Sequence, residues 1–102
     1  LEAVIVRALR ADLRSPPSMA EIAASVNVSE RTLRRRLLAA ELSYAALLDQ
    51  ERMRRALALL NAGESPMARV ADAAGFSDTR SLRRAIKRWT GQTPSQLRRH
   101  GD

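Results

Sequence analysis

Several residue types are scarce or missing in this chain of 102 residues, and each absence excludes a class of protein. There is no cysteine, which excludes disulfides, thiolate metal sites and cysteine nucleophiles. Charged residues interrupt every apolar run before it reaches the ~18 residues of a membrane span, and no signal peptide is recognisable. Four scattered glycines cannot form a phosphate-binding loop, and no metal-ligand spacing or pairing of a nucleophile with a base occurs. We therefore expect no enzyme activity, no metal and no cofactor.

The charge that is present is strongly basic. Lysine and arginine total 18 against 11 acidic residues, which gives a formal net charge of +7 and a pI near 11.5. Only Lys87 is a lysine, and all the other basic residues are arginines, whose guanidinium group binds phosphate or guanine through two parallel hydrogen bonds. An Ala- and Arg-rich genome explains part of this bias, but the balance favours a polyanionic partner.

The length predicts one domain, residues 1–102, because the chain is too short for two independent cores. Aromatic residues are 3% of the chain and strand-type alternation is absent, whereas Ala, Leu and Arg recur at helical spacing. We therefore predict an all-α fold. Its seven helices are expected at about 1–14, 19–26, 30–40, 44–62, 66–74, 78–90 and 94–100. Because the first residue is Leu1, we also expect a fragment of a longer protein whose sensory part is missing.

Polar residues at the expected helix starts support these boundaries. Ser18 and Glu21 have the spacing of a capping box, in which each side chain satisfies a free backbone donor. Ser29 and Ser77 are expected to cap the third and sixth helices, and Thr93 opens the last one.

Part of the sequence is repeated at an offset of 48 residues. The aligned pairs are Ile22 with Val70, Ala23 with Ala71, Asn27 with Gly75, Val28 with Phe76 and Ser29 with Ser77. Each copy provides a small residue where two helices cross, a turn residue that tolerates positive φ, and then a capped second helix. These features are typical of a helix-turn-helix. Similar helical hairpins occur in proteins that never bind DNA, but two copies in register predict nucleic-acid binding.

The second helix of each copy carries an arginine cluster, now at an offset of 49 residues. The aligned pairs are Arg31 with Arg80, Leu33 with Leu82, Arg34 with Arg83, Arg35 with Arg84 and Leu37 with Ile86. The second copy therefore has one extra residue near its cap. Because the apolar members are four residues apart and face inward, the arginines fall on the opposite side of each helix.

Helix geometry assigns roles to these basic residues. Residues in the first two turns of a recognition helix reach base edges in the major groove, and more distal groups hold phosphates. We expect base contacts from Arg31, Arg35, Thr79, Arg80 and Arg84, and contacts with bases or phosphates from Arg34 and Arg83. We expect phosphate contacts from Ser29, Arg36, Ser77, Lys87 and Arg88. For Arg36, Lys87 and Arg88, ordinary solvated surface is the alternative.

The repeat also predicts the domain organisation. The first helix-turn-helix unit spans 15–42, a linker helix spans 43–62, and the second unit spans 63–100. Tandem copies need no twofold axis, so their target should be a non-palindromic site in double-stranded DNA. Adjacent major grooves on one face are ~34 Å apart, and a linker of roughly 18 residues at ~1.5 Å per residue spans about 27 Å. The linker is therefore expected to act as a rigid spacer.

The stretch GFSDTRSLRRAIKRWTGQTPSQLRR, residues 75–99, resembles the C-terminal signature of the AraC/XylS family of bacterial transcription regulators. The resemblance extends over residues 19–99. It implies two homeodomain-like helix-turn-helix subdomains that enter successive major grooves of a promoter. It also implies a separate domain, usually N-terminal, that senses a small-molecule effector or mediates dimerisation. The resemblance further implies an activator that is cytoplasmic and nucleoid-associated and that contacts RNA polymerase.

The chain departs from the family pattern at several positions. Leu37, Leu82 and Ile86 stand where aromatic residues are usual, which makes the expected core aliphatic. Asn27 and Glu41 stand where glycines are usual.

Two aromatic residues and the basic helix faces allow other interpretations. Trp89 and Tyr44 could stack on bases, but both lie at helical spacing from apolar neighbours, and we expect them in the core. A helical interaction module or membrane-surface binder could also use the basic faces. Those faces lack flanking Trp or Phe anchors for a bilayer, so we expect no membrane partner.

Overall fold

The computed structural model describes the backbone of residues 1–63 and 66–100 and the side chains of residues 1–63 and 66–97. Over these residues all regular structure is helical, and the seven predicted helices are confirmed. None of the helices in the described ranges is both long and apolar enough to cross a membrane. The chain divides into two compact units, Leu1–Glu51 and Arg52–Asp102, and the boundary falls inside helix α4 (Tyr44–Ala62).

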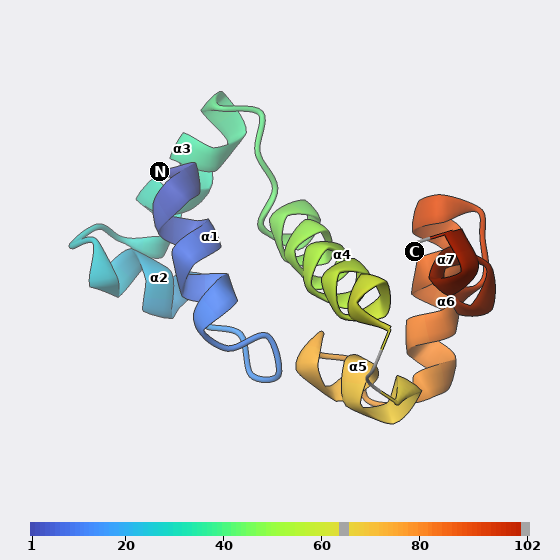
Figure 1. Ribbon diagram of the computed structural model, residues 1–102. Helices are drawn as coiled ribbons and strands as arrows, with labels where there is room; N and C mark the ends of the chain where they lie inside the picture. The colour runs from blue at the N-terminus through green and yellow to red at the C-terminus, as the bar shows by residue number, and fades with distance from the viewer. Residues whose placement is uncertain (64–65, 101–102) are drawn as a thin grey trace. The chain divides into compact units, whose positions relative to one another are not determined.

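The first unit consists of α1 (Glu2–Ala11), α2 (Met19–Ser25), α3 (Glu30–Ala39) and the first part of α4 (Figure 1). Each of these helices contributes buried apolar residues to one hydrophobic cluster. Its buried members are Ile5, Leu9, Leu13, Ile22, Ala23, Leu33, Leu37 and Leu47. The cluster fixes α3 against α2, which leaves the other side of α3 open to solvent.

Helix α1 ends three residues earlier than predicted, at Ala11 instead of Arg14. The side chain of Asp12 explains the difference, because its Oδ1 accepts hydrogen bonds from the backbone N–H groups of Arg14 (3.0 Å) and Ser15 (3.1 Å). Such a local side-chain bond offers the backbone an alternative to the helix. Leu13 nevertheless remains buried in the cluster.

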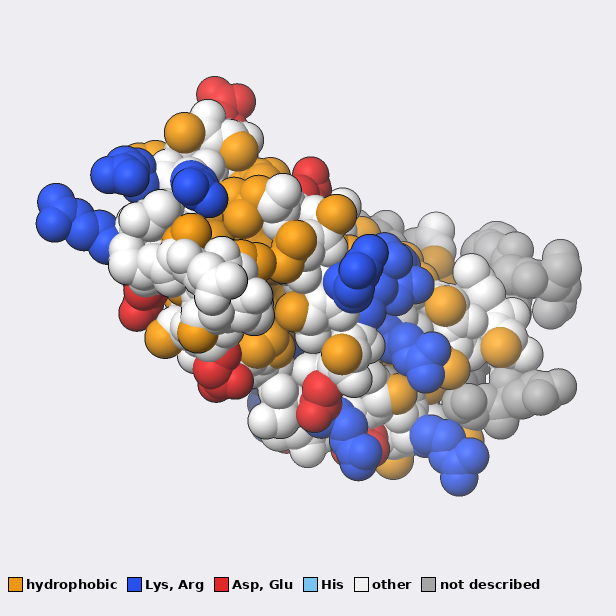
Figure 2. Space-filling model, turned by 90° about the vertical axis from the view of Figure 1, so that its left-hand side faces the viewer, with side chains coloured by type: hydrophobic (Ala, Val, Ile, Leu, Met, Phe, Trp, Pro, Cys, Tyr) orange, Lys and Arg blue, Asp and Glu red, His pale blue; other side chains and the backbone are white. Residues whose placement is uncertain are grey.

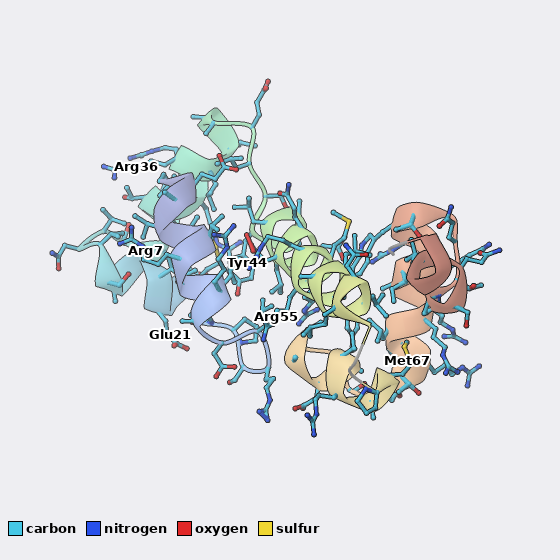
Figure 3. The ribbon with its side chains drawn as sticks, in the orientation of Figure 1. Arg7, Glu21, Arg36, Tyr44, Arg55 and Met67 are labelled. Atoms are coloured by element: carbon cyan, nitrogen blue, oxygen red, sulfur yellow. The ribbon has the colours of Figure 1, made fainter. Side chains whose placement is uncertain are left out.

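Two long-range polar contacts tie the first unit together. The Tyr44 hydroxyl donates a hydrogen bond to the Pro17 carbonyl, and the Tyr44 ring packs on the hydrophobic cluster (Figure 3), as the sequence predicted. Arg10 Nε donates to both carboxylate oxygens of Glu51, at 3.2 and 3.0 Å, although Glu51 is buried. This hydrogen bond raises the pKa of Arg10, so α1 is held to α4 by a charged pair.

The second unit consists of the rest of α4 with α5 (Met67–Ala73), α6 (Thr79–Thr90) and α7 (Pro94–His100). Its buried cluster contains Ala56, Leu60, Val70, Ala71, Ala74, Leu82 and Ile86. Trp89 and Phe76 pack against this cluster, with their ring centroids 5.8 Å apart. The prediction that Trp89 belongs to the core is confirmed.

The prediction of a single core was wrong, because the described residues form two separate hydrophobic clusters. Helix α4 explains how so short a chain supports both. It gives Leu47 to the first cluster and Ala56 and Leu60 to the second, so each unit gains an additional helix without additional chain.

The turn after α3 places a glutamate in a conformation that favours glycine. Glu41 has φ 58°, and its N–H donates to the Leu38 carbonyl (3.0 Å), while the N–H of Leu42 donates to the Leu37 carbonyl (2.8 Å). This pair of bonds is the Schellman motif, in which a left-handed residue closes a helix. The turn forms although the glycine usual here is missing, because these bonds and the packing of Leu42 on the core outweigh the local strain.

We predict that Glu41→Gly stabilises the protein. A left-handed residue other than glycine costs about 1–2 kcal/mol, and glycine removes this cost, although the greater freedom that it gives the unfolded chain offsets part of the gain. The free energy of unfolding in urea should therefore rise by about 0.5–1 kcal/mol. Gly91→Ala is the matched control, because Gly91 has φ 74° and no heavy atom lies within 4 Å of an added Cβ. That variant should lose stability, and a loss in Glu41→Gly as well would contradict the prediction.

Candidate nucleic-acid interface

The two predicted helix-turn-helix turns have the same backbone hydrogen bonds. The Ala23 carbonyl accepts from the N–H of Val28 at 3.0 Å, and the Ala71 carbonyl accepts from the N–H of Phe76 at 2.8 Å. Both alanines are only 2% exposed, so these small side chains are buried in the two units at equivalent positions. The 48-residue repeat inferred from the sequence is therefore a repeat of structure as well.

A left-handed residue reverses the chain in each turn. Asn27 has φ 59° in the first unit, and Gly75 has φ 89° in the second. Asparagine tolerates this region better than most residues, which explains why the first turn forms without the usual glycine. The N–H groups of these residues donate to the carbonyls of Ala24 (3.2 Å) and Asp72 (3.1 Å).

The caps of the two following helices differ in position by one residue. Ser29 caps α3 as predicted, because its Oγ accepts from the N–H of Thr32 at 3.0 Å. The predicted cap of α6 at Ser77 was wrong, since Asp78 Oδ1 accepts from the N–H of Ser81 at 2.7 Å instead. The one-residue insertion in the second copy explains this shift, and aspartate is as good a cap as serine.

The helices α3 and α6 present their arginines to solvent as the sequence predicted. On the inner sides, Leu33 and Leu82 are 0% exposed, and Leu37 and Ile86 are also buried. On the outer sides the exposed residues are Arg31, Arg34, Arg35, Arg36, Arg80, Arg83, Arg84, Lys87 and Arg88. Ser29 and Ser77 are exposed as well, and Thr79 is half-buried. Figure 2 shows basic side chains projecting at several places from the face that it draws.

Some of these basic groups already have partners within the protein. Arg34 Nη2 donates to Glu30 Oε1 at 2.7 Å, and Lys87 Nζ donates to the Gly91 carbonyl at 2.9 Å. The Arg88 guanidinium lies 5.7 Å from the centroid of the Trp89 ring. Arg36 extends outward from α3 in Figure 3.

Sequence reasoning missed Glu30 as a member of this surface. Its spacing of four residues from Arg34 is the signal for a helical ion pair and was available in the sequence. Arg52 was also missed. Its guanidinium lies 5.8 Å from the centroid of the Phe76 ring, beside the second turn, and no short-range pattern connects these two residues.

The Asp78 cap carries a charge that suits its position. The hydrogen bond from the Ser81 backbone N–H lowers the pKa of Asp78, and a bond with the Ser81 side chain and attraction by Arg80 and Arg84 lower it further. The N-terminal end of α6 therefore has a carboxylate close to the guanidinium groups of Arg80 and Arg84.

Comparisons with known proteins agree with this geometry. A family model described as a helix-turn-helix domain matches residues 22–100. The chain is similar to the HTH-type transcriptional regulator VqsM of Pseudomonas aeruginosa, with 40% identity over 82 residues that cover 80% of this chain and 25% of that protein. The chain spans about a quarter to a third of the length of the curated relatives it matches.

Two solved structures have a similar fold. A DNA-binding transcriptional dual regulator from Escherichia coli K-12 superposes with a TM-score of 0.88 at 24% identity, covering 98% of this chain and 90% of that one. A transcriptional regulator with an AraC-type DNA-binding domain, from Chromobacterium violaceum, superposes with a TM-score of 0.78 at 25% identity. The latter match covers 97% of this chain and 89% of that one.

We predict that the Asp78 cap makes α6 sensitive to acid. Because the folded pKa lies below the ordinary value of 3.8, the cap stabilises the protein above that pH and is lost as the pH falls through the folded pKa. Asp78→Asn keeps a capping oxygen that does not titrate, so its loss of stability between pH 7 and pH 3, measured by urea unfolding, should be smaller than that of the wild type. Asp78→Ala is the control and should be less stable than the Asn variant at pH 7. An equal acid loss in Asp78→Asn and the wild type would contradict this assignment.

Proposed function

The chain belongs to the AraC-type helix-turn-helix family of transcriptional regulators, and on that premise we propose that α3 and α6 read adjacent major grooves of one non-palindromic promoter site. The observation that supports this proposal is the duplicated turn, formed twice by the same hydrogen bonds and followed each time by a helix with an outward arginine face. A single such hairpin is common in proteins of other functions. Two of them in one chain match a target made of two short boxes.

The proposal assigns contacts by position along each recognition helix. Base readers are Arg31, Arg35, Thr79, Arg80 and Arg84, and Arg34 and Arg83 contact bases or phosphates. Phosphate contacts come from Ser29, Arg36, Ser77, Lys87 and Arg88. Arginine suits both tasks, because its planar donors match a guanine edge or a phosphate through two parallel bonds. The ion pair with Glu30 holds Arg34 in one orientation, which favours a base contact for this residue over a phosphate contact.

Helix α4 sets the reach between the two units in this proposal. Its 19 residues are about 28 Å long at ~1.5 Å per residue, and adjacent major grooves on one face of the duplex are ~34 Å apart. The length of this connection is therefore comparable with the spacing of the grooves. The two boxes should therefore lie about one helical turn apart.

The proposal for the whole protein follows from the family. A regulator of this kind works in the bacterial cytoplasm at promoter DNA, as an activator that contacts RNA polymerase. The effector acts through a separate domain, which accords with the small share of each curated relative that this chain spans.

Selection of sites from a random duplex pool tests the proposal directly. The 102-residue chain should enrich two different boxes about one turn apart, and footprinting on the selected site should protect both. Vesicles of anionic lipid, added in a parallel pull-down at the same ionic strength, serve as the competing polyanion. Enrichment of a single box, or capture by vesicles without capture by duplex, would overturn the proposal.

We predict that the base-reading arginines and the phosphate-contacting ones respond differently to mutation. Arg35→Ala and Arg84→Ala should each weaken binding to the selected site by about 1–3 kcal/mol, and binding to random duplex much less. Arg36→Ala removes the same charge from α3 but should weaken both kinds of binding alike. Fluorescence anisotropy at fixed salt measures the affinities of the wild type and the three variants for the selected and the random duplex. Equal losses on selected and random DNA would assign Arg35 and Arg84 to the backbone instead.

A further inference from the structure

Each unit has a groove beside its recognition helix, and the two grooves are made from equivalent positions of the repeat. In the first unit the shared positions are Met19, Arg34, Leu38, Ser43, Tyr44 and Ala45. In the second unit they are Met67, Arg83, Lys87, Thr93, Pro94 and Ser95. Both grooves lie between the start of the preceding helix, the outer flank of the recognition helix and the start of the helix that follows. The repeat has therefore preserved the place of the groove in both units.

The two grooves differ in charge. The second groove, with a volume of about 250 Å³, has two cations four residues apart on α6, Arg83 and Lys87. In the first groove, Leu38 occupies the position of Lys87, and its side chain is 78% exposed. Among the described residues that line the first groove, Arg34 is therefore the only cation.

A second difference neutralises the remaining cation of the first groove. Arg34 is paired with Glu30, with Nη2 and Oε1 2.7 Å apart. The residue equivalent to Glu30 in the second unit is Thr79, which has no charge to offer Arg83. The formal charge is therefore zero for Glu30, Arg34 and Leu38 in the first unit, and +2 for the equivalent residues Thr79, Arg83 and Lys87 in the second.

The second groove also places its ammonium group in a defined position. Lys87 Nζ donates one hydrogen bond to the Gly91 carbonyl at 2.9 Å, which holds it at the end of α6. A lysine ammonium has three N–H donors, so two remain for a ligand. Ser95, whose side chain is a hydroxyl, also lines this groove, and the residue is exposed. A compact anion with several acceptor oxygens suits this set of donors.

We propose that the groove formed by Arg83, Lys87 and Ser95 is a binding site for a phosphate of the DNA backbone, and that the equivalent groove of the first unit has lost this capacity. The proposal rests on the proposed function and adds an asymmetry to it. The second unit binds the DNA backbone through its groove as well as through its recognition helix. The first unit depends on the recognition face of α3, so its share of the salt-dependent binding is smaller.

The salt dependence of binding to random duplex tests this site in the full 102-residue chain. Each phosphate contact contributes about 0.9 to the slope of log affinity against log salt. Lys87→Leu should therefore flatten the slope by about 0.9, so that the loss of affinity between 50 and 200 mM salt shrinks about 3.5-fold. Arg7→Leu removes the same charge from α1, outside both grooves, and should leave the slope nearly unchanged. Circular dichroism verifies that both variants remain helical.

Transfer of the second groove's residues into the first unit provides the reciprocal test. Glu30→Thr combined with Leu38→Lys gives the first groove the same two cations, and both changed side chains lie on the outer side of α3. This double variant should steepen the slope by about 0.9 relative to the wild type. Leu38→Met with Glu30→Thr is the control for changes in shape and in the ion pair without a new cation. The variant with Leu38→Lys should therefore have a steeper slope than that control.

The outcomes separate this proposal from the function on which it rests. Lys87→Leu with a slope equal to that of Arg7→Leu would overturn the phosphate site, although the wild type still selects two boxes. A transplanted groove with the slope of its methionine control would overturn the asymmetry, because the first groove would then not face the backbone. A wild-type slope near zero, or no binding to duplex at all, would instead overturn the proposed function.

Discussion

A left-handed residue at the end of α2 and of α5 is the constraint on which the rest of each unit depends. Asn27 and Gly75 reverse the chain within one residue, and the carbonyls of Ala23 and Ala71 accept the hydrogen bonds that close the turn. The direction in which the next helix leaves is then fixed. The helix must pack its leucines on the alanine-lined crossing, and its arginines must face solvent. The exposure of the basic groups is thus a consequence of the backbone conformation at a turn that precedes the arginines in the chain.

The same constraint explains which parts of the molecule were predictable from the sequence. Turn residues, small crossing residues and apolar spacing are local signals, and they predicted seven helices, two hairpins and the inward leucines. The boundaries were less predictable where two polar residues compete. Asp78 displaced Ser77 as a cap, and Asp12 ended α1 early through its own side-chain bonds. Both results depend on backbone geometry that one-dimensional spacing does not contain.

Contacts between distant parts of the chain left no signal in the sequence. Arg10 and Glu51 are 41 residues apart, and the Arg52 guanidinium lies over the ring of Phe76, which belongs to the turn between α5 and α6 of the same unit. The number of cores was also misjudged, because chain length limits the amount of apolar surface but not how one long helix divides it. For the candidate interface, exposure of the basic residues followed from helical periodicity. Their partners did not, except for the ion pair of Glu30 with Arg34, whose spacing was visible.

The position of α4 in both hydrophobic clusters has a consequence for how the chain folds. Starting a helix is unfavourable, because several residues must be fixed for the first hydrogen bond, whereas adding a turn to an existing helix costs little. When one unit folds and orders its part of α4, the first turns of this helix already exist for the other unit. The other unit then only has to extend the helix, over Leu47 for the first cluster or over Ala56 and Leu60 for the second. A shared helix can therefore make two small cores behave cooperatively in folding.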